Sequence, residues 1–339
     1  MSTRMMLAAG GFTVLAATAG ITVSTQQARP ASAGRERPPI TKAQGERWNT
    51  ELSNWGRWGK DDQLGALNLV TAEKRRQAMA LAKTGTVVSL ERPVVLSPKP
   101  EVTKVDGKPH GISFYEIRFK TFPADDPQGN PGFSSDIQEF HVHGGMTHLD
   151  ALCHDSDGHG SLYNGYRLAE TVSETVGCTK LGLDNLKEGI VTRGVLIDMT
   201  RLSGAHEPGA RAYPEDIEAW EKQTGLTVSP GDALFVYNSA PVAGRGAPGG
   251  SGGFDLSVLP WFKTRGVAVT SNVRPLPDDR HADHRIVLSS MGVYLLDGVV
   301  LDQLAQTAAR LNRWEFMLVV APLRVPGSTG SPVNPLAMF

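Results

Sequence analysis

Cysteine is scarce in this chain of 339 residues, and neither sign of charge dominates it. The only two cysteines are Cys153 and Cys178, so the chain is no small scaffold held together by many disulfides. Lysine and arginine number 34 against 35 aspartates and glutamates, and no basic face argues for a nucleic-acid partner. The 37 glycines and 22 prolines imply many turns but show no repeat period. The composition indicates a globular protein that is long enough to bury a large core.

The first 33 residues have the pattern of a secretory signal peptide. Arg4 gives a short basic start, residues 5–23 are small and mostly apolar, and Ala31-Ser32-Ala33 fits a cleavage site. An uncleaved membrane anchor is the alternative, because the run has about the spanning length. The cleavage pattern favours export to the periplasm or medium, with no membrane contact afterwards. We therefore expect a flexible lead-in over residues 34–47 and a single domain over residues 48–339.

Export would place the two cysteines in an oxidising compartment, where a bridge between them can form. The sequence alone cannot place their Cα atoms within bonding distance. Cys153 lies between Leu152 and His154, where a small buried packing residue is a better interpretation than a thiolate ligand. We therefore do not predict the Cys153–Cys178 disulfide.

Five of the nine histidines fall between residues 141 and 159. His148 and Asp150 are two residues apart, so on an extended segment their side chains point to the same face. An imidazole and a carboxylate that converge make a mixed site suited to Zn²⁺, Mn²⁺ or Fe²⁺. His154 follows four residues after Asp150 and is placed to act as an acid or base beside the metal. A histidine-rich surface loop is the alternative, but several histidines next to one aspartate favour a metal site.

The second half of the chain predicts an α/β fold, with a mixed sheet core and flanking helices. Residues 194–199 and 233–237 are apolar runs typical of buried strands. Between them, Pro214 and Gly225 bracket a helix with Ile217 and Trp220 on one face. Strand, helix and strand at this spacing indicate an α/β unit. Residues 327–339 are expected to form a Gly/Pro-rich tail.

Two other stretches carry candidate site residues. Trp55 and Trp58 lie among glycines, where they could line a pocket or anchor a packing loop, and the sequence leaves both open. Residues 285–296 read as a helix that turns into a strand. This element would return Asp297 to the neighbourhood of His284.

Four blocks together resemble the cyclase family of metal-dependent hydrolases, which includes bacterial kynurenine formamidases, isatin hydrolases and trans-dienelactone hydrolases. The blocks are Asn54-Trp-Gly-Arg-Trp-Gly59 with residues 61–68, Thr147-His-Leu-Asp-Ala-Leu-Cys-His154 with residues 163–165, residues 284–305, and residues 321–335. The resemblance implies a swivelling β/β/α fold, a homodimer or homotetramer, and one or two Zn or Mn ions. It also implies hydrolysis of an amide, lactam, lactone or formamide bond.

The resemblance assigns roles position by position. His148 and Asp150 match metal ligands, His154 matches the catalytic histidine, and His284 matches a histidine of the second half. Asp297 stands where many members have glutamate. Gly144 stands where the family has a further ligand histidine, four residues before His148. His143, one residue away, would substitute if the Gly144-Gly145 segment bulges, and His141 is the lesser alternative.

These assignments predict an enzyme that acts on a small molecule. A divalent metal would activate water, and His154 would move the proton to the leaving nitrogen or oxygen. Trp55, Trp58 and Tyr163 would supply flat walls for a cyclic or aromatic substrate. Export fits poorly with an intracellular arylformamidase reaction. Among the candidate substrates, a general cyclic amide or ester therefore ranks above an aryl formamide. The alternative, which rests on Gly144 and Asp297, is an exported small-molecule or metal-binding protein that has lost catalysis.

Overall fold

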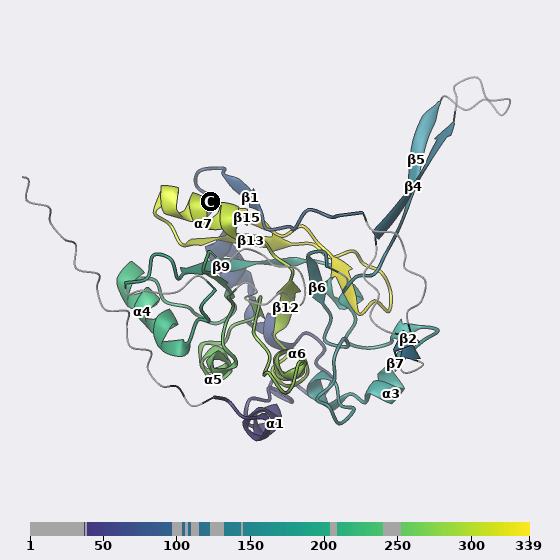
Figure 1. Cartoon of the computed structure of the whole chain (residues 1–339), viewed down its shortest axis with the longest axis horizontal. Helices are drawn as coiled ribbons and strands as arrows, with labels where there is room; N and C mark the ends of the chain where they lie inside the picture. Colours follow the sequence, from purple (N-terminus) through teal and green to yellow (C-terminus); the bar gives the residue numbers. More distant parts are fainter. Residues whose placement is uncertain are drawn as a thin grey trace, which may run out of the picture. The chain divides into compact units, whose positions relative to one another are not determined.

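A nine-stranded sheet forms the centre of the fold in the computed structural model (Figure 1). The structure describes residues 37, 39–96, 104–105, 108–109, 115–122, 132–143, 145–203, 209–239 and 252–339. The expected signal peptide at residues 1–33, the start of the lead-in and Gly144 lie outside the described residues. None of the described helices has both the length and the apolar character needed to cross a membrane.

The sheet is mixed, as the sequence predicts. Its strands in spatial order are β1 (Val87–Ser89), β15 (Leu336–Met338), β13 (Glu315–Val320), β9 (Ile190–Asp198), β10 (Ala233–Tyr237), β11 (Val269–Thr270), β12 (Tyr294–Asp297), β6 (His148–Asp150) and β14 (Gly330–Pro332). Strands β9 to β12 are parallel, and the pairs on both sides of them are antiparallel. Parallel strands are covered on both faces, which explains the unbroken apolar runs in β9 and β10.

Helices flank the sheet: α1 (Lys42–Glu51), α2 (Ala72–Met79), α3 (Leu168–Thr171), α4 (Pro214–Thr224), α5 (Leu259–Arg265), α6 (Ala282–His284) and α7 (Asp302–Leu311). Short 3-10 turns are η1 (Gly65–Leu69), η2 (Tyr163–Gly165), η3 (Leu183–Leu186) and η4 (Leu256–Val258), and η5 (Arg285–Ser290) is a π-helical segment. In Figure 1, α4 and α5 lie below the central strands and α7 lies above β13 and β15. The predicted helix α4 ends at Gly225, whose φ of 73° is the left-handed cap that glycine favours.

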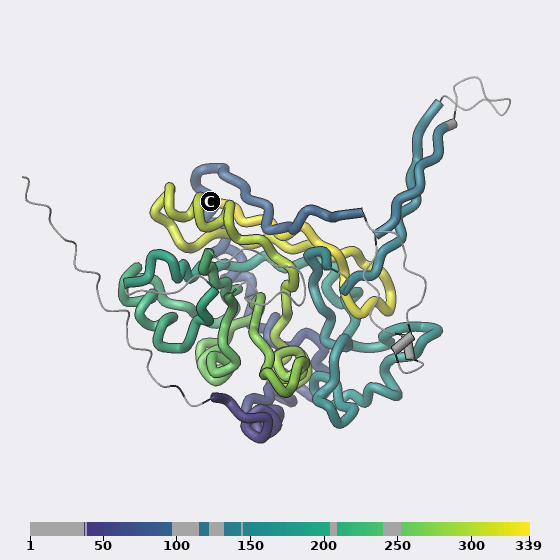
Figure 2. The backbone as a smooth tube through the Cα atoms, viewed as in Figure 1, coloured from purple at the N-terminus to yellow at the C-terminus, as the bar shows by residue number. Residues whose placement is uncertain are grey.

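The end of the chain is part of the sheet. Residues 327–339, which the sequence predicts to be a tail, contain β14 and β15 instead. Strand β15 pairs antiparallel with both β1 and β13, so Figure 2 shows the yellow C-terminal segment beside blue β1. Phe339 is fully buried, and its N–H donates to Thr86. This segment forms strands and not a tail because it pairs with strands that are far away in the sequence.

Four strands complete two small hairpins: β2 (Lys104–Val105) with β3 (Lys108–Pro109), and β7 (Val172–Ser173) with β8 (Gly177–Cys178). A longer hairpin joins β4 (Tyr115–Phe122) to β5 (Phe133–Phe140). Strand β5 ends immediately before His141. The hairpin therefore leads directly into the histidine-rich segment.

Candidate metal centre and active site

Strand β6 places the central pair of residues. It lies between β12 and β14, and its register sets His148 opposite Asp297 and Asp150 opposite Gly330. Three consecutive buried residues make up the strand, so both polar side chains are removed from water. His148 and Asp150 share one face of β6, as alternation along a strand requires.

Imidazole nitrogens surround the Asp150 carboxylate. His143 Nδ1 is 3.0 Å and His148 Nε2 is 3.4 Å from Asp150 Oδ1, while His284 Nε2 is 3.6 Å from Oδ2. His284 Nε2 is also 3.4 Å from Asp297 Oδ2. Asp150 is fully buried, and neither of its oxygens has a hydrogen bond within the described part of the chain. A buried carboxylate needs compensation, and a divalent cation shared with neutral imidazoles supplies it.

Two of the histidines have a polar partner on their far side. His148 Nδ1 is 2.8 Å from the Met146 carbonyl oxygen, so Nδ1 carries the proton and Nε2 keeps a lone pair toward Asp150. His284 Nδ1 is 3.1 Å from Asp283 Oδ2, which leaves its Nε2 directed at Asp150 and Asp297. Partners of this kind fix the tautomer and ring orientation of metal-binding histidines. The sequence analysis did not single out Asp283, although it directly precedes His284.

The donor atoms form two groups that share Asp150. One contains His143, Asp150 and His154, and the other contains His148, Asp150 and Asp297. Within each group the ligand atoms lie within 4.8 Å of one another. Mixed imidazole and carboxylate donors suit Zn²⁺ or Mn²⁺. The residues present therefore fit the divalent metal that the sequence predicts.

Burial and the neighbouring charges set the protonation of these groups. Burial lowers the pKa of His154 to about 4, so this ring is neutral at pH 7. Burial would also lower the pKa of His284, but Asp283 and Asp297 outweigh it and raise that pKa to about 12. Burial would raise the pKa of Asp150, but the surrounding histidines hold it well below its usual range. The centre thus combines an ionised Asp150 with a neutral His154. His284 carries a proton in the absence of a cation, and ligation of a metal would displace this proton, because a ligating imidazole is neutral.

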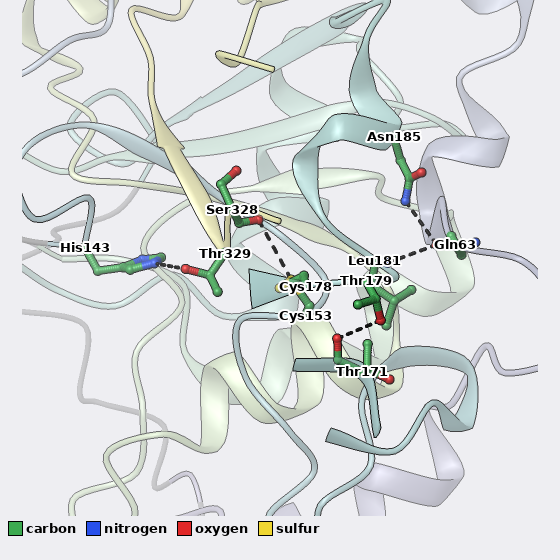
Figure 3. The surroundings of a disulfide bond; sticks show 10 residues. All are labelled: Gln63, His143, Cys153, Thr171, Cys178, Thr179, Leu181, Asn185, Ser328 and Thr329. Atoms are coloured by element: carbon green, nitrogen blue, oxygen red, sulfur yellow. Dashed lines mark hydrogen bonds between the residues drawn. A yellow bond between two sulfur atoms is a disulfide. The ribbon is translucent and has the colours of Figure 1, made fainter. Parts of the chain in front are cut away.

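His143 reaches the centre from the segment that follows β5. Its Nε2 is 3.1 Å from Thr329 Oγ1 (Figure 3), and its ring stacks on His154 with centroids 3.8 Å apart. His141 lies one ring further away, 6.1 Å from His143 between centroids. The structure thus brings His143 to Asp150, while Gly144 is outside the described residues. Thr329, which the sequence analysis passed over, is the residue that holds the far nitrogen of His143.

Trp55 and Trp58 lie on a loop that is tied to η2, the short turn that contains Tyr163. Trp55 is 38% exposed, and its Nε1 donates to the Ser289 carbonyl at 2.6 Å. Tyr163 is fully buried and donates its hydroxyl to Asp62 at 2.8 Å. The Asn164 amide donates to carbonyl oxygens of residues 59, 60 and 62. Trp58 is partly buried and packs against the core, with the Arg57 guanidinium over its ring. Asn164 therefore shapes this loop, and Trp55 is its most exposed predicted wall residue.

Cys153 and Cys178 form a disulfide, with their Cα atoms 6.4 Å apart. The sequence analysis does not predict this bridge, whereas the burial of Cys153 agrees with its interpretation as a buried residue. Strand β8 brings Cys178 to Cys153, and sequence spacing alone does not reveal this approach. Figure 3 shows the bridge beside Ser328, one residue from the Thr329 that contacts His143. The bridge closes the segment that begins immediately before His154.

Comparison with known proteins decides the family. A family model described as a putative cyclase matches residues 81–271. This chain belongs to the cyclase family. A crystal structure described as a novel cyclase shares 30% identity over 86% of this chain and 99% of its own, with a TM-score of 0.70.

More distant solved structures include two isatin hydrolases. Isatin hydrolase A from Ralstonia solanacearum is 20% identical over 74% of this chain and 91% of its own, with a TM-score of 0.50. Isatin hydrolase A from Labrenzia aggregata is 21% identical over 79% and 99%, with a TM-score of 0.49. No curated protein matches the chain. The predicted family and the mixed α/β sheet with flanking helices are confirmed.

Proposed function

We propose that this protein is a metal-dependent hydrolase that opens an amide, lactam or lactone bond of a small cyclic or aromatic molecule. The observation that carries the proposal is the fully buried Asp150 carboxylate, which faces His143, His148 and His284 without a hydrogen bond among the described residues. Such a carboxylate is costly to bury unless a cation neutralises it. The isatin hydrolase names of the distant structures agree with the reaction class.

Five residues would hold a Zn or Mn ion, or two such ions: His143, His148, Asp150, His284 and Asp297. When bound, the cation supplies Lewis acidity for attack of water on a carbonyl group. The shared position of Asp150 between two donor groups allows it to serve either one or two ions. The Met146 carbonyl and the Asp283 carboxylate keep the rings of His148 and His284 oriented.

His154 would move the proton. Its ring is neutral at pH 7 because burial lowers its pKa to about 4. A neutral ring takes a proton from the attacking water and then returns it to the leaving nitrogen or oxygen. The stacked His143 ring fixes the plane of His154 during both steps. His154 also belongs to one of the two groups of donor atoms, together with His143 and Asp150, and could therefore bind the metal itself. Metal content must for this reason be measured together with activity.

The setting of the site is also part of the proposal. Trp55 and Trp58 would provide flat apolar walls, with Tyr163 as the buried support of their loop.

We also propose export to the periplasm or medium after removal of residues 1–33, and a homodimer or homotetramer. An exported location favours a general cyclic amide or ester over an arylformamidase substrate.

The test is hydrolysis of a panel of lactams, lactones, aryl formamides and linear amides by the metal-loaded mature chain. We expect turnover of at least one cyclic or aromatic member. We expect His154→Ala to keep its metal and lose about 10²- to 10⁴-fold in kcat. His159→Ala is the matched control, because His159 is an exposed histidine on the same segment, and it should retain activity.

Three results would separate the alternatives. Full activity in His154→Ala would refute its role as the acid and base. Loss of metal in His154→Ala would make this residue a ligand instead. A metal-loaded wild type that turns over no member of the panel would favour the binding protein that has lost catalysis.

A further inference from the structure

An irregular loop at residues 321–329 carries the residue that supports His143. The loop joins β13 to β14, and its Leu323 and Val325 side chains are 55% and 51% exposed. Thr329 stands at the end of the loop, with its Oγ1 3.1 Å from His143 Nε2 (Figure 3). Exposed loops open more readily than paired strands, so the position of Thr329 depends on the contacts that anchor the loop.

The disulfide supplies two of these anchoring contacts. Cys178 lies on β8, and its N–H donates to the Gly327 carbonyl oxygen at 2.9 Å. On the other side of the bridge, Cys153 Sγ lies 3.9 Å from the Ser328 carbonyl oxygen (Figure 3). The two bridged residues therefore contact the two consecutive loop residues that directly precede Thr329.

The same loop is also joined to the segment that carries His154. The Ala151 N–H donates to the Thr329 carbonyl oxygen at 2.9 Å, and the His154 N–H donates to the Ala151 carbonyl oxygen at 2.9 Å. Cys153 directly precedes His154, whose ring stacks on His143 with centroids 3.8 Å apart. The bridge, the end of the loop and the two stacked rings thus form one connected unit.

We propose that the Cys153–Cys178 bridge and Thr329 are positioning elements of the metal centre, which act through His143. The bridge holds the loop, and the Thr329 hydroxyl accepts from His143 Nε2. This leaves His143 Nδ1, 3.0 Å from Asp150 Oδ1, with a lone pair for the cation. The inference rests on the proposed function, because it names the supports of a metal ligand in that proposal.

The test is the Zn²⁺ affinity of the full mature chain, measured by competition with a chelator of known affinity. We expect Cys153→Ala/Cys178→Ala to weaken Zn²⁺ binding about 10- to 100-fold, which is the usual effect of removing the support of a ligand histidine. Thr329→Val removes the hydroxyl at nearly constant shape and should weaken binding over the same range. Thr329→Ser keeps the hydroxyl and should bind Zn²⁺ like the wild type.

Thr179→Val is the matched control. Thr179 directly follows Cys178, but its hydroxyl donates to the Thr171 carbonyl oxygen at 3.0 Å and not to the metal centre. This variant should therefore keep the wild-type affinity. Circular dichroism at 25 °C shows which variants are folded, and in a folded chain a loss of stability alone does not change the affinity for a metal. The measurement thus separates positioning from stabilisation of the fold.

A folded double cysteine variant with wild-type affinity would overturn the role of the bridge. Wild-type affinity in Thr329→Val would overturn the route through His143, and this variant decides the case even where the double variant does not fold. Equal losses in Thr329→Ser and Thr329→Val would show that the hydroxyl has no part in it. A wild type that binds metal but hydrolyses no substrate would refute the hydrolase and leave this inference standing, so the two can fail separately.

Discussion

Removing the Cys153–Cys178 disulfide should destabilise the protein by about 3.5 kcal/mol. The bridge closes a loop of 25 residues, and the entropy that this loop removes from the unfolded chain at 25 °C gives this figure. For a domain of about 300 residues, the same free energy lowers Tm by about 5–6 °C. The perturbation is the double variant Cys153→Ala/Cys178→Ala, because both side chains are buried and alanine adds no polar group.

The assay is denaturant unfolding of wild type and double variant, each with and without a strong thiol reductant. The reductant should lower the free energy of unfolding of the wild type by about 3.5 kcal/mol and leave the variant unchanged. The difference within the wild type isolates the cross-link from the packing lost with the sulfur atoms. A wild type whose unfolding curve is the same in both conditions would refute the reasoning.

Three further substitutions test the packing and electrostatics around the sheet. Gly65→Ala should cost about 3 kcal/mol, because Gly65 has a φ of 56° and a Cβ there would overlap the Gly292 carbonyl; an unchanged Tm would contradict this. Lys74→Ala should cost about 3 kcal/mol in denaturant unfolding, because the Lys74 ammonium is 2.8 Å from the fully buried Asp232. A cost below about 1 kcal/mol would mean that this pair behaves like a surface ion pair. Burial raises the pKa of Asp198, so the folded state keeps that proton to higher pH and loses stability as pH rises above about 3.9, the unfolded value. The stability of Asp198→Asn relative to wild type should therefore increase from pH 3.5 to pH 7, and a difference independent of pH would count against this.

The sequence predicts correctly those elements whose local residue pattern matches their surroundings in the folded protein. Strands β9 and β10 read as buried because both faces of a central parallel strand are covered. Helix α4 is bounded by Pro214 and Gly225, whose backbone preferences act locally. His148 and Asp150 follow from the two-residue period of a strand. These features need no knowledge of distant contacts.

The remaining features depend on contacts between segments that are far apart in the sequence. Strands β14 and β15 lie in a Gly/Pro-rich stretch, and only their pairing with β6, β1 and β13 orders them. The contact of Thr329 with His143 joins residues 186 positions apart. The disulfide depends in the same way on the placement of β8. Asp283 is different, because a carboxylate directly before a candidate ligand histidine is a signal that the sequence offers.

The central claim is that Asp150 organises a divalent metal centre, and metal content tests it most directly. Elemental analysis of the purified wild type should find about one or two equivalents of Zn or Mn per chain. Asp150→Asn should lose this metal, because the amide removes the charge that the cation needs. Asp157→Asn, on the same segment, should retain it. A wild type that binds no metal after reconstitution, or an Asp150→Asn variant that keeps its full metal content, would contradict the account.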